Sequence, residues 1–379
     1  MKKNFTVWLI ALFGLMGMSA ATVQAQTTPT SGTTGPLTWK YDTGTKTLNI
    51  SGKGEMPSYR YVEKNQLLPT TPWLAFKNEL AHAIIEEGVT GISDCTFYEL
   101  SELVSVTLPK SLLKIEHFAF VNCKKLPALT IPAGVKEIKD GAFIMCSALA
   151  AITVDTANTA YSSVDGVLFD KEKVVLNFYP EAKPDKAYSI PVGVKGTTFY
   201  ALTRASRLTS VTLPAGMIGV GLGAFAYCEN LESVTLPDGF RFLNPYAFRD
   251  CKNLKSITLL TKTPPNVLSD AFEGVSLANV TLTVPKGSKA AYAAAPVWKE
   301  FKQIAESTVS NVLLPEARIY TADGRLYLTL SRAETVHIYN VSGALVRTFN
   351  APAGETSITL PQGVYVVRAG ERTEKVIVE

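Results

Sequence analysis

The strongest constraint on the fold of this chain is a repeat of 23 residues that begins at Gly88. Three blocks follow one another over 88–156, and three more cover 193–261 in the same register after an interruption. Each block carries an apolar frame, in which an aliphatic residue is followed three and five residues later by two more. One block cannot bury its own apolar side, so the blocks must stack on one another, and the stack is the folding unit.

The end of each apolar frame alternates between apolar and polar residues, which predicts a short strand. Stacking places equivalent strands side by side in parallel, as in a leucine-rich repeat. A phenylalanine precedes the frame in most blocks, at Phe97, Phe120, Phe143, Phe225 and Phe248. Leu202 replaces it in the fourth block, so we expect a local irregularity over 193–205. With a degenerate seventh copy over 268–285, the predicted solenoid covers 88–285.

The third block shows the pattern V-x-x-I-x-x-x-A-F-x-x-C-x-x-L-x-x-V-x-L-P most fully. The matching residues are Val135, Ile138, Ala142, Phe143, Cys146, Leu149 and Ile152. On these residues the chain resembles the BspA-type leucine-rich repeat surface proteins of the Bacteroidetes, over about 35–300. The resemblance implies that residues 35–87 form an N-terminal cap. Within the cap, the pattern around Asp42–Gly44 predicts a β-hairpin that shields the open end of the solenoid.

The first residues indicate export. Lys2 and Lys3 precede a short apolar run, and the small residues of "VQA" end at Ala25. This order is typical of a secretory signal peptide over 1–25, and the run is short for a membrane anchor. We therefore expect a secreted or cell-surface protein at the exterior of the outer membrane. We also expect a flexible linker over 26–34 and no membrane-spanning segment in the mature chain.

Two further segments interrupt and follow the repeats. In the interruption, 157–192, apolar stretches flank Asp170–Lys173 and predict a β-hairpin insert that elaborates one edge of the solenoid. A binding loop is the alternative interpretation. After the seventh copy, the Ala-rich stretch 286–304 carries several aromatic residues and predicts a C-terminal cap helix.

The last segment, 305–379, consists of short alternating stretches separated by turns. The turns fall at Asp323–Gly324, Ser342–Gly343 and Gln362–Gly363. This spacing predicts a small antiparallel β-sandwich, so the expected fold class is mainly β, a leucine-rich repeat solenoid plus a sandwich. The stretches Ile338–Gly343 and Gly363–Arg368 resemble the C-terminal sorting domains of type IX secretion cargo. The resemblance implies export across the outer membrane, and a spacer domain is the alternative.

Most of the cysteines share one place in the repeat, three residues after the phenylalanine. They are Cys123, Cys146, Cys228 and Cys251. Equivalent positions in stacked coils lie about 4.8 Å apart, a distance that by itself permits a disulfide. Stacked copies nevertheless point the same way, toward the core, so we expect a reduced structural ladder of buried thiols. Cys95 lies outside this frame.

No group of residues in the sequence indicates catalysis. His82, His117 and His337 have no carboxylate or cysteine at ligand spacing, so we predict no metal site and no cofactor. No nucleophile elbow, phosphate-binding loop or metalloprotease motif is present. Without the signal peptide the chain has 35 basic and 33 acidic side chains, which gives no electrostatic case for nucleic acid. We therefore predict that the protein is not an enzyme.

The last polar position of the frame is a threonine in every regular block. These residues are Thr107, Thr130, Thr153, Thr212, Thr235 and Thr258. Strand propensity and a ladder of hydroxyl groups explain them structurally. Alternatively, they line a concave face that binds a ligand. We expect a binding or adhesion module for a host protein, extracellular matrix or a glycan. A surface glycan-binding protein and a structural envelope protein without a specific soluble ligand are the alternatives.

Overall fold

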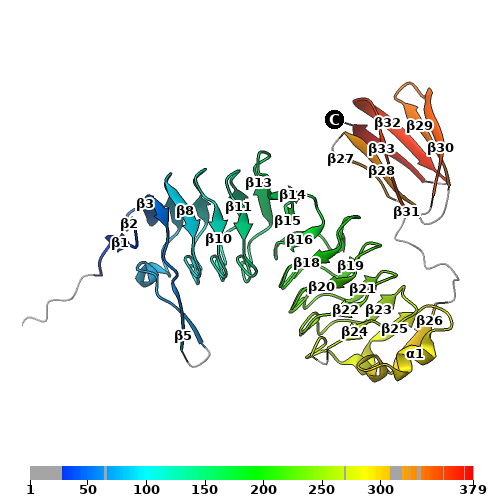
Figure 1. The fold of residues 1–379 in the computed structure, drawn as a ribbon, viewed down its shortest axis with the longest axis horizontal. Helices are drawn as coiled ribbons and strands as arrows, with labels where there is room; N and C mark the ends of the chain where they lie inside the picture. The colour runs from blue at the N-terminus through cyan, green and yellow to red at the C-terminus, as the bar shows by residue number, and fades with distance from the viewer. Residues whose placement is uncertain are drawn as a thin grey trace, which may run out of the picture.

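The computed structural model describes residues 28–378, apart from 64–65, 269, 308–317, 323, 331–333, 353 and 371. The expected signal peptide, 1–25, lies outside these residues. The fold class is the predicted one, because the repeats stack into a solenoid of strands and further sheets follow at the C-terminal end (Figure 1). Within the described residues, no helix has the length and apolar character needed to cross a membrane.

The N-terminal cap starts a sheet that the first coil continues. Its strands are β1 Ser31–Thr34, β2 Leu37–Asp42, β3 Thr47–Gly52, β7 His82–Ile85 and β9 Ser105–Thr107. β1 to β3 are antiparallel, and β7 and β9 follow in parallel. The expected flexible linker over 26–34 is therefore wrong for residues 31–34. They pair with residues 37–40 of β2, because β2 otherwise presents an open edge.

The rest of the cap closes the end of the core. Its elements are β4 Gly54–Glu55, β5 Arg60–Glu63, β6 Gln66–Pro69 and η1 Leu74–Phe76. β5 and β6 form a hairpin that projects from the stack (Figure 1). Trp73 is fully buried, and its Nε1 donates a hydrogen bond to the Thr96 carbonyl at 3.0 Å. The tryptophan therefore ties the cap to the first coil.

We name the six regular blocks coil 1 to coil 6, over 88–110, 111–133, 134–156, 193–215, 216–238 and 239–261. Strands on the first side of the stack are β8 Val89–Ile92, β10 Lys114–Ile115, β12 Glu137–Ile138, β18 Gly196–Thr197, β20 Gly219–Val220, β22 Phe242–Leu243 and β24 Asn266–Val267. Strands on the second side include β11 Ala128–Ile131, β13 Ala151–Val154, β19 Ser210–Thr212, β21 Ser233–Leu236, β23 Ser256–Leu259 and β25 Thr281–Val284. Leu129 pairs with Ile152, which reproduces the 23-residue period in three dimensions.

A column of phenylalanine rings fills the core between the two sides. Ring centroids are 5.0 Å apart for Phe97–Phe120 and 5.1 Å apart for Phe225–Phe248. Leu202 occupies the same place in coil 4, is fully buried, and donates its amide to the Ala224 carbonyl at 2.8 Å. The irregularity expected over 193–205 is therefore wrong. The main-chain bonds between coils do not depend on which apolar side chain fills the core.

The interruption is part of the stack and does not elaborate one edge. Its strands are β14 Tyr161–Val164, β15 Val167–Asp170, β16 Val175–Phe178 and β17 Ala187–Ser189. β14, β15 and β16 are antiparallel, but β16 also pairs in parallel with β18, and β17 with β19. Residues 171–192 therefore form a further coil, which we call the insert coil. Its stretch "AYSIP" matches "ALTIP" of coil 2, but the altered spacing upstream conceals the repeat.

β15 belongs to two hydrophobic cores. Val167 and Phe169 pack into the core of the insert coil and coils 4 to 6. Leu168, between them, packs into the core of the cap and coils 1 to 3. All three side chains are fully buried. Since successive residues of a strand point to opposite faces, one strand serves as a wall of both cores.

The C-terminal cap contains the predicted short helix within 286–304. Its elements are η2 Leu277–Asn279, α1 Lys289–Ala294, η3 Trp298–Glu300 and β26 Gln303–Glu306. Tyr292 and Trp298 are fully buried and donate hydrogen bonds to the carbonyls of Thr261 and Pro265, both at 2.8 Å. β26 pairs in parallel with β25, so the solenoid sheet continues past the helix.

The C-terminal unit consists of two antiparallel sheets, as predicted. Its strands are β27 Arg318–Ala322, β28 Arg325–Leu330, β29 Glu334–Asn340, β30 Leu345–Ala351, β31 Gly354–Thr359, β32 Gly363–Ala369 and β33 Arg372–Val378. The orders are β27-β28-β31 and β30-β29-β32-β33, and both sheets contribute to one core that includes Leu328 and Ile338. The expected turn at Gln362–Gly363 joins the two sheets and does not close a hairpin. Asp323 lies outside the described residues.

Candidate functional site

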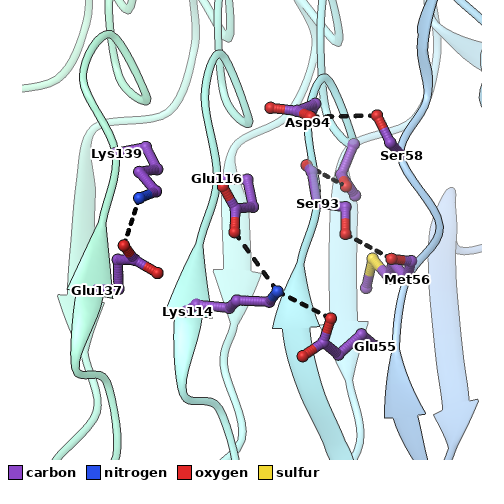
Figure 2. A network of polar contacts seen from close by, with 10 residues as sticks. Glu55, Met56, Ser58, Ser93, Asp94, Lys114, Glu116, Glu137 and Lys139 are labelled. Carbon is purple, nitrogen blue, oxygen red and sulfur yellow. Dashed lines mark hydrogen bonds and ion pairs between the residues drawn. The ribbon is translucent and has the colours of Figure 1, made fainter.

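Charged side chains on the first side of the N-terminal coils pair with one another (Figure 2). Lys114 Nζ lies 2.8 Å from Glu55 Oε2 and 3.5 Å from Glu116 Oε1. The hydrogen bond to Glu55 raises the pKa of Lys114. Gly91 lies between these partners, and a Cβ there would stand 3.1 Å from the Lys114 side chain. The missing side chain lets Lys114 cross β8 to the cap, so these charges join the cap to coil 2 across coil 1.

The predicted threonines lie on the second side of the stack, but not in one continuous row. Two groups are in register, Thr130 with Thr153 and Thr212 with Thr235 and Thr258. Thr107 pairs instead with Ile84 of the cap, and Ser189 of the insert coil pairs with Thr212. The hydroxyl oxygens of Thr130 and Thr153 are 2.9 Å apart, so these groups bond to each other. A ligand-binding role for the threonines stays a prediction.

The four in-frame cysteines point into the core and bond to the preceding coil. Their thiols donate to main-chain carbonyls, Cys123 to Phe97, Cys146 to Phe120, Cys228 to Leu202 and Cys251 to Phe225, at 3.0–3.1 Å. All five cysteines of the described chain are buried, free thiols. Burial raises the pKa of Cys123 well above its ordinary value and that of Cys95 to about 11. Such thiols stay protonated and are poor nucleophiles.

Tyrosine and arginine side chains gather on the turns of coils 4 to 6. We call Tyr200, Arg204, Tyr227, Tyr246 and Arg249 the tyrosine–arginine cluster. The Arg204 guanidinium carbon lies 4.7 Å from the centroid of the Tyr227 ring. The Arg249 guanidinium carbon lies 5.8 Å from the same centroid and 5.0 Å from that of Tyr246. All five residues are half-buried, so the cluster combines fixed aromatic surface with partly accessible cations.

The geometry of the coil positions this cluster. Tyr200 and Tyr246 stand at the eighth position of their coils and Arg204 and Tyr227 at the twelfth, all with φ between 56° and 60°. Coils 1 to 3 have positive φ at the same two positions, so this backbone conformation belongs to the coil and not to a special site. Gly223 follows Tyr200 in the stack, and a Cβ there would lie 2.7 Å from the tyrosine ring. The glycine therefore makes room for the ring.

The two arginines differ in their partners. Arg249 lies 3.4 Å from Glu273, whereas Arg204 has no ion pair among the residues that the structure describes. Arg249 Nε is buried and has no hydrogen-bond acceptor in the described part of the chain. Burial, followed by the neighbouring hydroxyls of Tyr246 and Tyr227, raises the pKa of Tyr200. At neutral pH the site therefore offers a neutral tyrosine hydroxyl and a guanidinium without a carboxylate partner.

A buried carboxylate of the insert coil lies next to the cluster. Glu181 Oε1 accepts a hydrogen bond from the Met145 amide. No regular coil follows coil 3 at this point to supply a main-chain acceptor for that amide. In coil 2 the equivalent Asn122 amide bonds to the Ile144 carbonyl of the next coil, so Glu181 replaces a missing main-chain acceptor. Burial raises the pKa of Glu181 to about 7, against the opposing effects of the Met145 amide and Arg204. The residue is only 4% exposed.

The histidines and the in-frame cysteines are engaged in hydrogen bonds to oxygen atoms. The histidines contact hydroxyl or carbonyl oxygens, His82 with Ser105, His117 with Asp140 and His337 with Thr348. Among the described residues, no cluster of histidine, cysteine or carboxylate side chains has the geometry of a metal site. A general base beside a nucleophile is the minimum for covalent catalysis, and the buried cysteines have no histidine partner. Tyrosine and arginine, by contrast, dominate the binding energy of many protein interfaces.

Sequence reasoning missed both the tyrosine–arginine cluster and Glu181. The cluster residues stand at turn positions that vary from coil to coil, outside the apolar frame used to align the repeats. The one available signal was the gain of tyrosine and arginine at these positions in coils 4 to 6. Glu181 belongs to no motif, and its role emerges only from the missing coil beside Met145.

Comparison with known proteins agrees with this architecture. A family model for the BspA type leucine-rich repeat region, in six copies, matches residues 74–169 and 183–293. The chain belongs to the BspA-type leucine-rich repeat family. The gap in the match falls within the interruption. None of the curated proteins matches the chain.

Solved structures of other bacterial proteins are also similar to this BspA-type chain. A protein from Eubacterium ventriosum is 20% identical, with coverage of 65% of this chain and 94% of that one and a TM-score of 0.35. The pneumococcal vaccine antigen PcpA is 18% identical, with coverage of 74% and 99% and a TM-score of 0.40. A leucine-rich cell surface protein from Faecalibacterium prausnitzii is 20% identical, with coverage of 74% and 96% and a TM-score of 0.31. At these TM-scores the likeness says nothing about what this chain binds.

Proposed function

We propose that this chain is an exported cell-surface binding module without catalytic activity, and that the tyrosine–arginine cluster is the centre of its binding site for a protein. The observation that carries the proposal is the packing of Arg204 and Arg249 around Tyr227 on an accessible turn surface. Tyrosine supplies a large contact area with little loss of side-chain entropy, and arginine is enriched with it in binding hot spots. The family membership supports a repeat module that presents an extended surface.

The cluster favours a protein over a glycan. Sugars bind on open aromatic faces, but both guanidinium groups already lie over the Tyr227 ring. Arg204, which has no ion pair among the described residues, is suited to carboxylate groups, which proteins present on aspartate and glutamate. A host surface or matrix protein is therefore the proposed partner. Glycan binding and a purely structural envelope role are the competing outcomes.

Export follows from the terminal segments in this proposal. The signal peptide over 1–25 would be removed, and the C-terminal unit over 305–379 would act as a sorting domain of the type IX kind in a member of the Bacteroidetes. The two-sheet architecture of that unit supports this role. N-terminal sequencing of secreted protein would test the cleavage site. Retention in the periplasm after deletion of 305–379, with the full chain at the surface, would support the sorting role.

The binding proposal is tested with the mature chain on an array of host matrix proteins and glycans. We expect binding to at least one protein, and a loss of about tenfold or more in affinity for Tyr227→Ala and Arg249→Ala. Thr235→Ala is the matched control on the second side of the stack. If Thr235→Ala weakens binding and the cluster variants do not, the threonine face is the site. A folded protein that binds no protein on the array would contradict the proposal.

A further inference from the structure

Coils 4 to 6 and the degenerate coil after them expose large apolar side chains on the first side of the stack. We call these residues the apolar face: Phe199, Ile218, Phe242 and Leu268, which are 48%, 46%, 38% and 49% exposed. Phe199 is next to Tyr200 in the chain, so the apolar face continues into the tyrosine–arginine cluster. Leu222 and Pro245 follow Phe199 at the same position in the next two coils and are half-buried.

The same side of coils 1 to 3 is built differently. There charged residues of coils 2 and 3 form ion pairs, such as Glu137 with Lys139 and Lys114 with Glu55 (Figure 2). In coils 5 and 6 the positions equivalent to Lys114 and Glu137 are Gly219 and Phe242. One scaffold therefore presents a self-paired charged half and an apolar half. Exposed apolar patches on an exported protein mark sites of interaction.

Gly219 shows that the aromatic ring is accommodated at the surface. Phe242 pairs with Gly219 across β20 and β22, and its ring lies over the glycine. A Cβ at Gly219 would stand 2.2 Å from the ring, so any other residue would displace it. The φ of Gly219 lies outside the left-handed region, so the glycine is needed for space and not for a turn.

Unpaired cations border the apolar face. Lys195 and Arg241 are exposed at the start of their coils' strands, on either side of Ile218 in the stack. Arg204 lies at the opposite border, within the tyrosine–arginine cluster. None of the three has an ion pair within the described parts of the chain. A partner surface that is complementary to this face would therefore present an apolar stripe flanked by carboxylate groups.

We infer that the apolar face docks an acidic amphipathic helix of a partner protein, laid along the axis of the solenoid. Neighbouring coils are about 4.8 Å apart and successive turns of an α-helix about 5.4 Å, so a helix along the axis advances by about one turn per coil. Four coils span roughly 14 Å, which corresponds to two to three helical turns. This inference rests on the proposed protein-binding function and specifies the chemistry of the partner.

A second copy of the chain fits this face less well. A two-fold contact would bring the same cations, Lys195 and Arg241, to both sides of the interface. The helix α1 contains no acidic residue, so it cannot supply the carboxylate flanks. Self-association is therefore an outcome that would contradict the inference.

The test uses the full mature chain and fluorescein-labelled 16-residue peptides in an anisotropy titration. One peptide has a leucine stripe flanked by glutamates, a second has lysines in place of the glutamates, and a third has the acidic composition with the stripe scrambled. We expect the acidic stripe to bind about tenfold more tightly than the other two. Leu268→Asp and Arg241→Glu should each weaken that binding at least about fivefold. Leu113→Asp, at a 48% exposed leucine of coil 2, should leave it unchanged.

Three results would overturn the inference. The first is that the acidic-stripe peptide binds no more tightly than the scrambled peptide, or does not bind at the highest concentration. The second is that Leu113→Asp weakens peptide binding as much as Leu268→Asp does. The third is that the chain dimerises in sedimentation velocity and that Leu268→Asp abolishes the dimer. The parent proposal is scored separately on the matrix array. If array binding is lost in Arg249→Ala but kept in Leu268→Asp, the protein-binding function stands and the helix-docking inference fails.

Discussion

Glu181 makes the stability of the solenoid depend on pH in a direction opposite to that of an ordinary paired carboxylate. Burial raises its pKa in the folded state to about 7, from an ordinary value of 4.5. Below pH 4.5 the group is protonated in both states and contributes no dependence. Between pH 4.5 and about 7 only the folded state holds the proton, so stability falls as pH rises. At about 1.4 kcal/mol per pH unit, the total loss is about 3 kcal/mol, complete above pH 7.

The substitution Glu181→Gln should remove this dependence. Glutamine does not titrate, and its carbonyl oxygen still accepts the hydrogen bond from the Met145 amide. At pH 8 we expect the variant to be more stable than the native chain by about 2 kcal/mol, since the weaker neutral hydrogen bond offsets about 1 kcal/mol of the gain. The assay is urea unfolding at pH 5, 6, 7 and 8, followed by tryptophan fluorescence, with the exposed Glu229→Gln as control. Parallel pH profiles for Glu181→Gln and the native chain would refute the reasoning.

Three other substitutions or measurements test the core. Phe120→Ala should lower the free energy of unfolding by about 3–5 kcal/mol, because the ring is fully buried between Phe97 and Phe143. Substitution of the exposed Phe199 by alanine should change it by about 0.5 kcal/mol or less. Similar losses for the two variants would contradict the packing. Thiol titration of the denatured, unreduced chain should find five free thiols, and three or fewer would show a disulfide. Gly219→Ala should cost about 1–3 kcal/mol by displacing the Phe242 ring, and an unchanged melting curve would argue against that contact.

The sequence was sufficient to predict the structural features that recur in every coil, and insufficient to predict the features that occur only once. Every coil must bury the same apolar side, so the frame around Leu129 and Ile152 predicted strands, register and stacking correctly. The ring at Phe120 was likewise expected in the core, because a large apolar residue recurs there. The insert coil escaped notice because Tyr179 fills the core in place of phenylalanine, in a segment with altered spacing.

The candidate site was beyond sequence reasoning for a related reason. Its side chains stand at turn positions whose residue type changes from coil to coil, so no periodic signal selects them. Tyr227 becomes part of a site only because Arg204 of the preceding coil and Arg249 of the following coil converge on its ring. Contacts across stacked coils join residues about 23 positions apart, which a local motif cannot encode. The linker over 26–34 failed similarly, since only the open edge of β2 makes a strand of residues 31–34.

The position of β15 has a consequence for how the solenoid responds to force or heat. Repeat arrays usually unravel coil by coil, because each coil contacts only its neighbours. Here Leu168 and Phe169, adjacent in the chain, are anchored in different cores. Detaching one half must pull this strand out of the other, so the two halves should lose structure as one cooperative unit. A single strand thereby couples two stacks of coils, each of which could otherwise unfold from its end, so that they resist force or heat together.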